Sequence, residues 1–263
     1  MDARHRYGWR PDLPDRRDWK IRYNRGVARA DLAVKVSLRS QMPAITSQGF
    51  LGACTSHTVL ALLGHSQLQL SNNLLFNPSA MFVYYNTRIL ERTVQVDSGS
   101  SIRNAIKSLA IYGVCDEFHW PYVIERFKLK PNKRCYRQAL DKSSLFYRRV
   151  PQTLTDLRTC LHNGLPVAFG FSVYESFESA EVKKTGIIPV PRSLERCVGG
   201  HATVLTGYDD TTQTFEVRNS YGTEWGDKGY GQMHYSYITD SSLSDDFWTM
   251  NLVEDRGCSC LVE

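Results

Sequence analysis

The chain has 263 residues, 42% hydrophobic and 22% charged, with 10 Pro and 18 Gly, a composition typical of globular proteins that excludes collagen and low-complexity sequence. No run of about 18 apolar residues occurs and no apolar signal-peptide segment is visible near the start, so we expect a soluble protein, cytoplasmic or secreted by another route. The net charge of +5 arises from residues 1–35, with ten Lys or Arg against five Asp; the balanced remainder argues against nucleic-acid binding.

The first 35 residues form an extension of irregular sequence that is rich in aromatic side chains. Its segment Pro11–Asp15 has the composition of turns, and its apolar residues keep no regular period. Aromatic residues in a polar segment favour packing on a surface, so we expect the extension to lie on the folded domain; a disordered tail is the alternative. The aromatic residues are Tyr7, Trp9, Trp19 and Tyr23.

Three helices are predicted between residues 36 and 150. The first begins at Cys54, after Gly49 and Gly52, and the second covers residues 78–90. The third follows a polar cap at Ser100 and Ser101 and ends at Gly113. The first helix has apolar residues three and four positions apart, which indicates a face turned to a core; these are Val59, Leu62 and Leu63.

Strands dominate after residue 151. One short helix comes first, capped by Thr153 and ended by Asn163 and Gly164. Helices followed by strands predict an α+β protein with two lobes and a cleft between them, a helical lobe over 36–150 and a β lobe over 151–263. Five strands are predicted, at 166–173, 202–208, 214–218, 230–235 and 248–253.

Three glycine-rich segments contain the candidate catalytic side chains. They are Gln48–Cys54, Gly199–Ala202 and Arg218–Gly226. The seven cysteines show no zinc-binding spacing, so we expect no metal and no cofactor. The pairing of the six cysteines other than Cys54 stays open.

Together these segments predict a thiol nucleophile. A helix start and a nearby imidazolium lower the pKa of a cysteine thiol, which suits Cys54 and His201. The side-chain oxygen of Asn219 can orient the second imidazole nitrogen without adding charge. The backbone N–H of Cys54 and the side-chain amide of Gln48 can stabilise an oxyanion. Two other histidines on the Cys54 helix, His57 and His65, are interpreted as structural.

The order Cys, His, Asn, with Gln six residues before the Cys, and the segment NSYGTEWG resemble the papain-like cysteine peptidases, over residues 36–255. The resemblance implies a two-lobe fold with a helical lobe, a β lobe similar to an antiparallel barrel, and the active site between them. It also implies the roles of nucleophile for Cys54, general base and acid for His201, orienting residue for Asn219 and oxyanion donor for Gln48.

Residues that contact substrate are expected from the same resemblance. Ser98 and Gly99 resemble the loop whose backbone pairs with an extended peptide. Gly52 and Gly200 resemble the small residues beside the Cys and the His, and Trp225 the tryptophan that packs beside the Asn.

Three departures from the family pattern indicate a divergent microbial or viral branch and leave substrate preference open. The cysteine usual at the position of Leu51 is missing, and with it a disulfide to a residue near 97. Thr55 stands where the family has an aromatic residue. Tyr221 stands where the family has a tryptophan.

The resemblance implies a cysteine endopeptidase that acts on proteins or peptides, with no nucleic-acid or membrane partner, as a monomer. A transglutaminase-like acyl transferase and a non-catalytic binding module are the alternatives. Since only about 35 residues precede the domain, a long helical prodomain does not fit in the sequence. We expect residues 1–35 instead to lie over the domain, as a passive strap or as an inhibitor across the cleft whose deletion raises activity.

Overall fold

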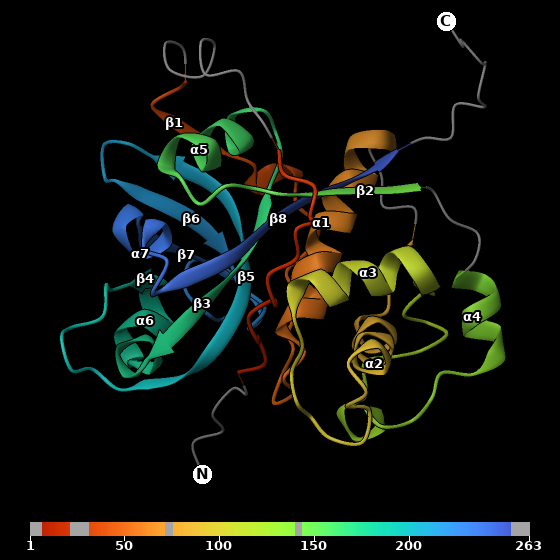
Figure 1. Cartoon of the computed structure of the whole chain (residues 1–263). Coiled ribbons are helices and arrows are strands. Elements are labelled where there is room, and N and C mark those ends of the chain that lie inside the picture. The colour runs from red at the N-terminus through yellow and green to blue at the C-terminus, as the bar shows by residue number, and fades with distance from the viewer. Residues whose placement is uncertain (1–6, 22–31, 72–75, 140–143, 254–263) are drawn as a thin grey trace, which may run out of the picture.

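The computed structural model describes residues 7–21, 32–71, 76–139 and 144–253. The helices between residues 80 and 139 gather on one side and a large sheet with its own short helices lies on the other, with the long helix α1 (Cys54–Ser71) between them (Figure 1). In the described residues, no helix combines the length and the apolar character needed to cross a bilayer.

The helical lobe forms around α1, most of which is buried. The helix α2 (Ala80–Leu90) begins after Ser79, whose hydroxyl accepts from the backbone N–H of Phe82. The helix α3 (Ile102–Tyr112) is capped by Ser101 and ends at Gly113, which has the positive φ of 63° that glycine adopts without strain. All three helices were predicted. The short α4 (Lys133–Ala139) was not.

The β lobe contains one sheet in the order β2-β8-β3-β5-β6-β7-β4, with β1 paired to β5. Pairing is antiparallel except between β4 and β7. The strands are β1 (Lys35–Ser37), β2 (Ser144–Arg149), β3 (Val167–Tyr174), β4 (Ile187–Ile188), β5 (Cys197–Asp209), β6 (Thr214–Arg218), β7 (Tyr230–His234) and β8 (Ser244–Val253).

This sheet agrees with the predicted α+β class and refines two details of the β lobe. It is an open path of strands in the described residues, without the closing pair of a barrel. The strand β2 was assigned to the helical lobe, but it pairs with β8 along its whole length and belongs to the sheet. It lies at an edge of the sheet, and none of residues 145–149 is fully buried, so its sequence lacks the apolar run of a central strand.

The helices on the sheet side are α5 (Leu154–His162), α6 (Ala180–Thr185) and α7 (Tyr235–Thr239). As predicted, Thr153 caps α5, its hydroxyl accepting from the backbone N–H of Asp156 at 3.0 Å. The β-lobe core is rich in aromatic rings, and Phe169 stacks on Phe247 with an interplanar angle of 6°. This core holds β3 and β5 rigidly, and β5 contains His201.

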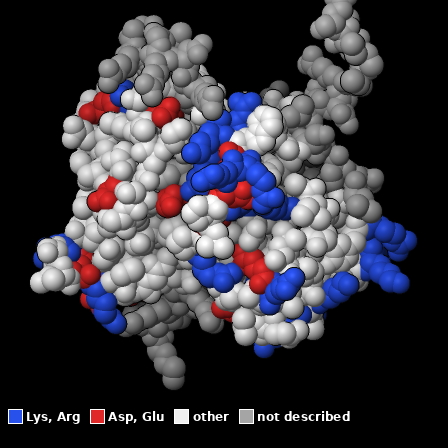
Figure 2. All heavy atoms as spheres, viewed as in Figure 1, with Lys and Arg blue, Asp and Glu red and all other residues white. Residues whose placement is uncertain are grey.

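Residues 7–21, named the strap here, run along the boundary between the two lobes as the red trace at the centre of Figure 1. The strap has no helix; its backbone forms isolated bridges to Ser100 and Arg149. Figure 2 shows that basic and acidic side chains gather together at the centre of this face, where the strap crosses, rather than forming one broad basic surface.

Candidate active site

Cys54 is the first residue of α1 and is completely buried. The turn before it is tight, with the Ala53 N–H donating to Leu51 O at 2.7 Å. Burial raises the pKa of the Cys54 thiol to about 11, although the nearby backbone N–H groups of Ala202, Gly8 and Thr55 act in the opposite direction. The thiol is thus protonated while the strap covers it.

His201 lies inside β5, and Asn219 follows the end of the neighbouring strand β6. The two side chains meet at 2.8 Å between His201 Nε2 and Asn219 Oδ1, and both are buried. The Ser220 backbone N–H donates to the same Asn219 oxygen at 2.8 Å. Because an amide oxygen only accepts hydrogen bonds, Nε2 is the donor, and Nδ1 is the His201 atom available for proton exchange.

Aromatic rings surround the His201 imidazole. The Tyr221 ring lies 4.9 Å from it, centroid to centroid, and Phe171 lies 5.6 Å away. Trp225 is buried and packs edge-on against Tyr221 at 6.2 Å. Tyr221 therefore packs on the His201 ring at the position where the family has a tryptophan. Trp225 in turn packs against Tyr221.

Gln48 is fully buried and makes hydrogen bonds to residues of both lobes. Its side-chain Nε2 donates to Leu51 O at 2.9 Å, and its Oε1 accepts from the Ser220 hydroxyl at 2.7 Å. The Gln48 backbone N–H donates to Ser220 O at 2.9 Å, next to a bridge between Ser47 and Tyr221. The predicted oxyanion donor and the predicted orienting Asn are thereby held in one network.

The glycines predicted beside the substrate all border the strap. A Cβ on Gly52 would lie 3.4 Å from Gly8 Cα, and one on Gly99 would lie 2.0 Å from Gly8 O. A Cβ on Gly200 would lie 2.7 Å from Trp9 O. The Ser98 hydroxyl instead donates to Thr93 Oγ1 and to Gly99 O, which both lie outside the strap.

Ser100 is the backbone-pairing residue that sequence reasoning missed. Its N–H donates to Gly8 O at 2.7 Å and its carbonyl accepts from the Arg10 N–H at 3.1 Å. For pairing with an extended substrate, the sequence predicted the neighbouring residue, Gly99. Gly99 has φ of +66°, which turns its backbone away from the extended pairing geometry; nothing in the sequence distinguishes the two positions.

A carboxylate joins the segments that a disulfide joins in the family. Asp97 Oδ1 accepts from the Gly52 N–H at 3.1 Å and from the Tyr84 hydroxyl. The same hydroxyl accepts from the Gly99 N–H at 3.2 Å. The loop beside Cys54 is thus held to the loop beside Ser100 by polar contacts instead of a covalent bond. The candidate disulfide partners Cys258 and Cys260 lie outside the described residues.

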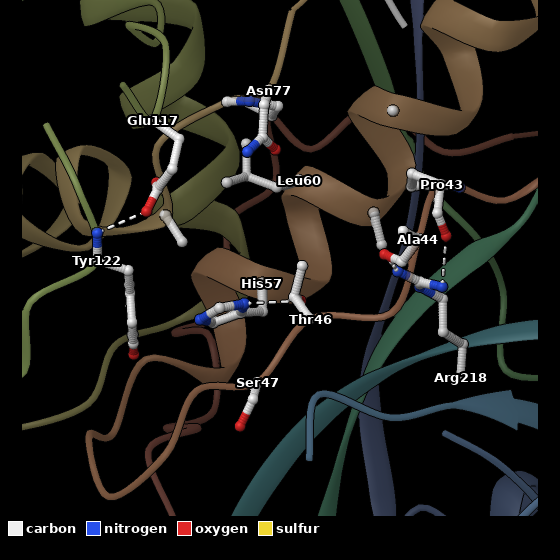
Figure 3. Close-up of a pocket in the computed structure, with 14 residues that line it drawn as sticks. Pro43, Ala44, Thr46, Ser47, His57, Leu60, Asn77, Glu117, Tyr122 and Arg218 are labelled. Atoms are coloured by element: carbon white, nitrogen blue, oxygen red, sulfur yellow. Dashed lines mark hydrogen bonds between the residues drawn. The ribbon is translucent and has the colours of Figure 1, made fainter. Parts of the chain in front are cut away.

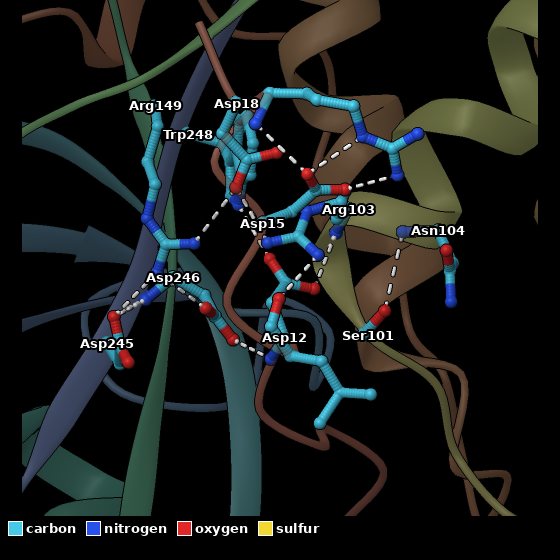
Figure 4. Close-up of polar contacts among 12 residues, drawn as sticks. Asp12, Asp15, Asp18, Ser101, Arg103, Asn104, Arg149, Asp245, Asp246 and Trp248 are labelled. Atoms are coloured by element: carbon cyan, nitrogen blue, oxygen red, sulfur yellow. Dashed lines mark hydrogen bonds and ion pairs between the residues drawn. The ribbon is translucent and has the colours of Figure 1, made fainter. Parts of the chain in front are cut away.

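The strap lies across Cys54 and His201. The Trp9 N–H donates to Gly200 O at 2.9 Å, and the Tyr7 ring lies 6.2 Å from the His201 ring. Further along, Asp12, Asp18, Arg103 and Arg149 form the polar network of Figure 4. Residues 7–21 of the extension thus contact both lobes.

His57 lies three residues after Cys54 on α1 and contacts a different set of residues. Its Nδ1 is 2.9 Å from Thr46 Oγ1, and its ring lines a cavity of about 270 Å³ with Arg218, Glu117 and others (Figure 3). Burial and the Arg218 charge lower the pKa of His57 to about 3, so it is neutral. This histidine is structural, and His65 is likewise buried.

No cluster of three or more His, Cys, Asp or Glu side chains suited to a metal ion occurs in the part of the chain that the structure describes. The groups that meet at the candidate site are the Cys54 thiol, the His201 imidazole and the amides of Gln48 and Asn219.

Comparisons with known proteins agree with this geometry. A family model described as papain family cysteine protease matches residues 42–247. A peptidase C1-like protein of Acanthamoeba polyphaga mimivirus is 36% identical over 273 residues, covering 95% of this chain and 88% of that protein. Peptidase 1 of Dermatophagoides farinae is 26% identical over 206 residues, covering 74% of this chain and 58% of that protein.

Two solved structures are similar in fold. Xylellain, a cysteine protease from Xylella fastidiosa, has a TM-score of 0.87 at 37% identity, covering 94% of this chain and 96% of that chain. A digestive procathepsin L 3 of Tenebrio molitor larval midgut has a TM-score of 0.68 at 17% identity, covering 90% of this chain and 75% of that chain, and so shows the fold alone.

Proposed function

Since the chain belongs to the papain family of cysteine proteases, we propose that it cleaves peptide bonds with Cys54 as nucleophile, His201 as general base and acid, and Asn219 as the residue that orients His201. The observation that carries this assignment is the 2.8 Å contact between His201 Nε2 and Asn219 Oδ1 beside the Cys54 helix start. This contact leaves Nδ1 to take the thiol proton.

The reaction proceeds in two steps. Cys54 Sγ bonds to the carbonyl carbon of the substrate, the C–N bond breaks, and His201 gives its proton to the departing amine. Water then attacks the thioester, with His201 accepting one of its protons, and the acid product leaves as the thiol is restored. A protein or peptide chain is the substrate.

Gln48 is the proposed side-chain donor to the oxyanion that forms on the carbonyl oxygen. An amide nitrogen has two N–H groups, and Leu51 O takes one of them in the strapped chain. The contacts of Gln48 with Leu51 and Ser220 fix its orientation before substrate arrives, which is what makes such a donor effective.

The strap is proposed to inhibit the enzyme until it moves. Its Gly8 and Trp9 occupy the line between Ser100 and Gly200 where an extended substrate would pair, and Cys54 beneath it is inaccessible. The raised pKa of Cys54 supports the same proposal, because the thiolate is the reactive form.

A cleavage assay with three chains tests this function. The wild-type chain, Cys54→Ala and Cys197→Ser are incubated with a fluorogenic peptide library under reducing conditions. Cys197 is the matched control because its thiol is exposed and free. Once the strap has been displaced or removed in all three chains, we expect cleavage by the wild type and Cys197→Ser, and none by Cys54→Ala.

Two other results would contradict the proposed peptidase function. If every chain is folded, the strap has been displaced or removed, and no peptide is cleaved, the site is a binding module or a narrow acyl transferase. Cleavage that persists in Cys54→Ala would place the nucleophile elsewhere.

A further inference from the structure

The strap residue Trp9 fills a slot beside the proposed catalytic residues. Its backbone is held on both sides, by Gly200 O and by the bridge to Ser100, while its indole is 8% exposed. Gly8, the residue before it, lies over Gly52 next to Cys54. An extended substrate that pairs with the same two backbone segments places one of its side chains where the Trp9 indole now lies.

Two glycines create the space for this indole. A Cβ on Gly170 of β3 would lie 1.9 Å from Trp9 Cε2, and a Cβ on Gly200 of β5 would lie 2.8 Å from Trp9 Cε3. Atoms do not approach so closely, so no residue with a side chain at Gly170 is compatible with a ring in this position. The Trp9 slot, defined by Gly170, Gly200 and Asp246, is therefore wide and flat.

A buried carboxylate ends the slot. Trp9 Nε1 donates to Asp246 Oδ2 at 3.1 Å, and the side chain of Asp246 is fully buried. The other oxygen, Oδ1, accepts from Arg149 at 2.9 Å. Arg149 belongs to β2 and Asp246 to β8, so this ion pair stays when the strap leaves.

The emptied slot consequently presents one acceptor oxygen of a carboxylate that is already bonded to Arg149. Oδ2 of Asp246 loses both the Trp9 indole N–H and the Asp12 backbone N–H, which donates at 2.7 Å in the strapped chain. A buried acceptor that is left without a donor is unfavourable. Because Arg149 bonds to Oδ1, the free oxygen of Asp246 is Oδ2, and a planar ring that carries an N–H donor both satisfies this oxygen and fills the space between the two glycines.

We propose that the Trp9 slot is the main specificity pocket and selects a tryptophan side chain in the substrate, by flat shape and by the hydrogen bond to Asp246. This inference rests on the proposed function, since it names the substrate class of that same site. Phenylalanine fits the shape but lacks the donor, and alanine has neither feature. Arginine has donors but lacks the flat ring that fills the space beside Gly170 and Gly200.

The test uses the full-length Trp9→Ala chain, in which the slot is vacated, and fluorogenic peptides that differ at one position by Trp, Phe, Arg or Ala. We expect Trp to exceed Phe by about tenfold in kcat/KM, from the lost hydrogen bond, and Ala by on the order of 100-fold. Equal rates for Trp and Phe, or a preference for Arg, would overturn the proposal.

A binding measurement separates this inference from the proposed function. The Cys54→Ala, Trp9→Ala chain is titrated with the same peptides by calorimetry, which needs no cleavage. Tighter binding of the Trp peptide supports the slot even if no peptide is hydrolysed, in which case the proposed function alone fails. Hydrolysis with no binding difference between Trp and Phe overturns the slot alone.

Substitutions outside the strap test the slot a second time, with the strap sequence unchanged. Asp246→Asn should reduce the Trp to Phe ratio toward one; Asn suits the φ of +59° at this position. Asp245→Asn is the matched control, since Asp245 also binds Arg149 but does not bond to Trp9. Gly170→Ala should shift the preference to small side chains, and an unchanged Trp preference in it would contradict the proposal.

Discussion

Two polar clusters connect the lobes of this protein, and they are built from different chemistry. The cluster around Cys54 and His201 uses neutral groups, among them the amides of Gln48 and Asn219 and the hydroxyl of Ser220. The strap cluster uses charges, with Asp18 paired to Arg103 at 2.7 Å and Asp246 to Arg149 at 2.9 Å.

The difference follows from what each cluster does. Neutral hydrogen bonds between buried groups stay intact across pH and salt, which suits a permanent catalytic geometry. Carboxylates and guanidinium groups are well solvated when they separate, and their attraction depends on protonation and ionic strength. The strap can therefore be released without disturbing the groups that carry out the reaction.

Removing the imidazole should have the largest effect on the neutral cluster. His201→Ala should lower kcat/KM on the order of 10²–10⁴-fold, because proton transfer to and from the substrate is lost. Steady-state hydrolysis by equal amounts of folded protein checks this. His65→Gln is the control, a buried histidine on the same helix as Cys54, and it should retain the wild-type rate per folded molecule; similar losses in both variants would contradict the assignment.

Removing the amide of Gln48 should have the next largest effect. Gln48→Ala should lower kcat on the order of 10²–10³-fold with little change in KM, because the oxyanion forms only as the reaction proceeds. A kcat and KM measurement separates this from weaker substrate binding. Gln69→Ala is the control, since Gln69 bonds to the exposed Gln41 side chain; a change confined to KM would remove Gln48 from its proposed role.

Weakening the charged cluster should raise activity. Asp12 Oδ2 accepts from Trp248 Nε1 at 2.9 Å, and Oδ1 accepts from the Arg103 N–H at 3.2 Å. Asp12→Ala removes both contacts and should raise the initial rate about tenfold. Asp15→Ala is the matched control, because Asp15 bonds to Arg17 within the strap. Equal initial rates in wild type and Asp12→Ala would mean that the strap does not limit access.

The smallest predicted effect is that of pH on strap closure. Burial, and then the Asp12 charge, raise the pKa of Asp246 to about 7 in the strapped chain; Asp245 acts in the same direction, and Arg149 opposes it. The strapped form thus binds a proton more tightly than the released form. Closure is strongest at low pH and weakens as pH rises toward 7, by at most about tenfold per pH unit.

The ratio of initial rates at pH 8 and pH 5, compared between wild type and Asp246→Asn, measures this effect. The comparison cancels the ionisation of Cys54 and His201, which both chains share. We expect the larger ratio in the wild type. A larger ratio in Asp246→Asn would reverse the inferred direction of the coupling.

Much of the helical structure in both lobes was predictable because its signals are local. Ser101 and Gly113 bound α3, and Thr153 begins α5, by contacts within one helical turn. The edge strand β2 was missed because its partner β8 is about a hundred residues away along the chain, and because Leu, Phe and Tyr in its sequence SLFYRR are followed by two arginines instead of alternating with polar residues.

The sequence alone determined the candidate catalytic residues and the family they resemble, because Gln48, Cys54, His201 and Asn219 are chemically distinctive and keep a characteristic order. The tertiary structure alone decided that Ser100, not Gly99, is the residue that pairs with the strap, and that Trp9 contacts Asp246 from 237 positions away. Such contacts depend on how two lobes and an irregular segment pack. No local propensity encodes that packing, whereas caps and reactive side chains follow from residue type and near neighbours.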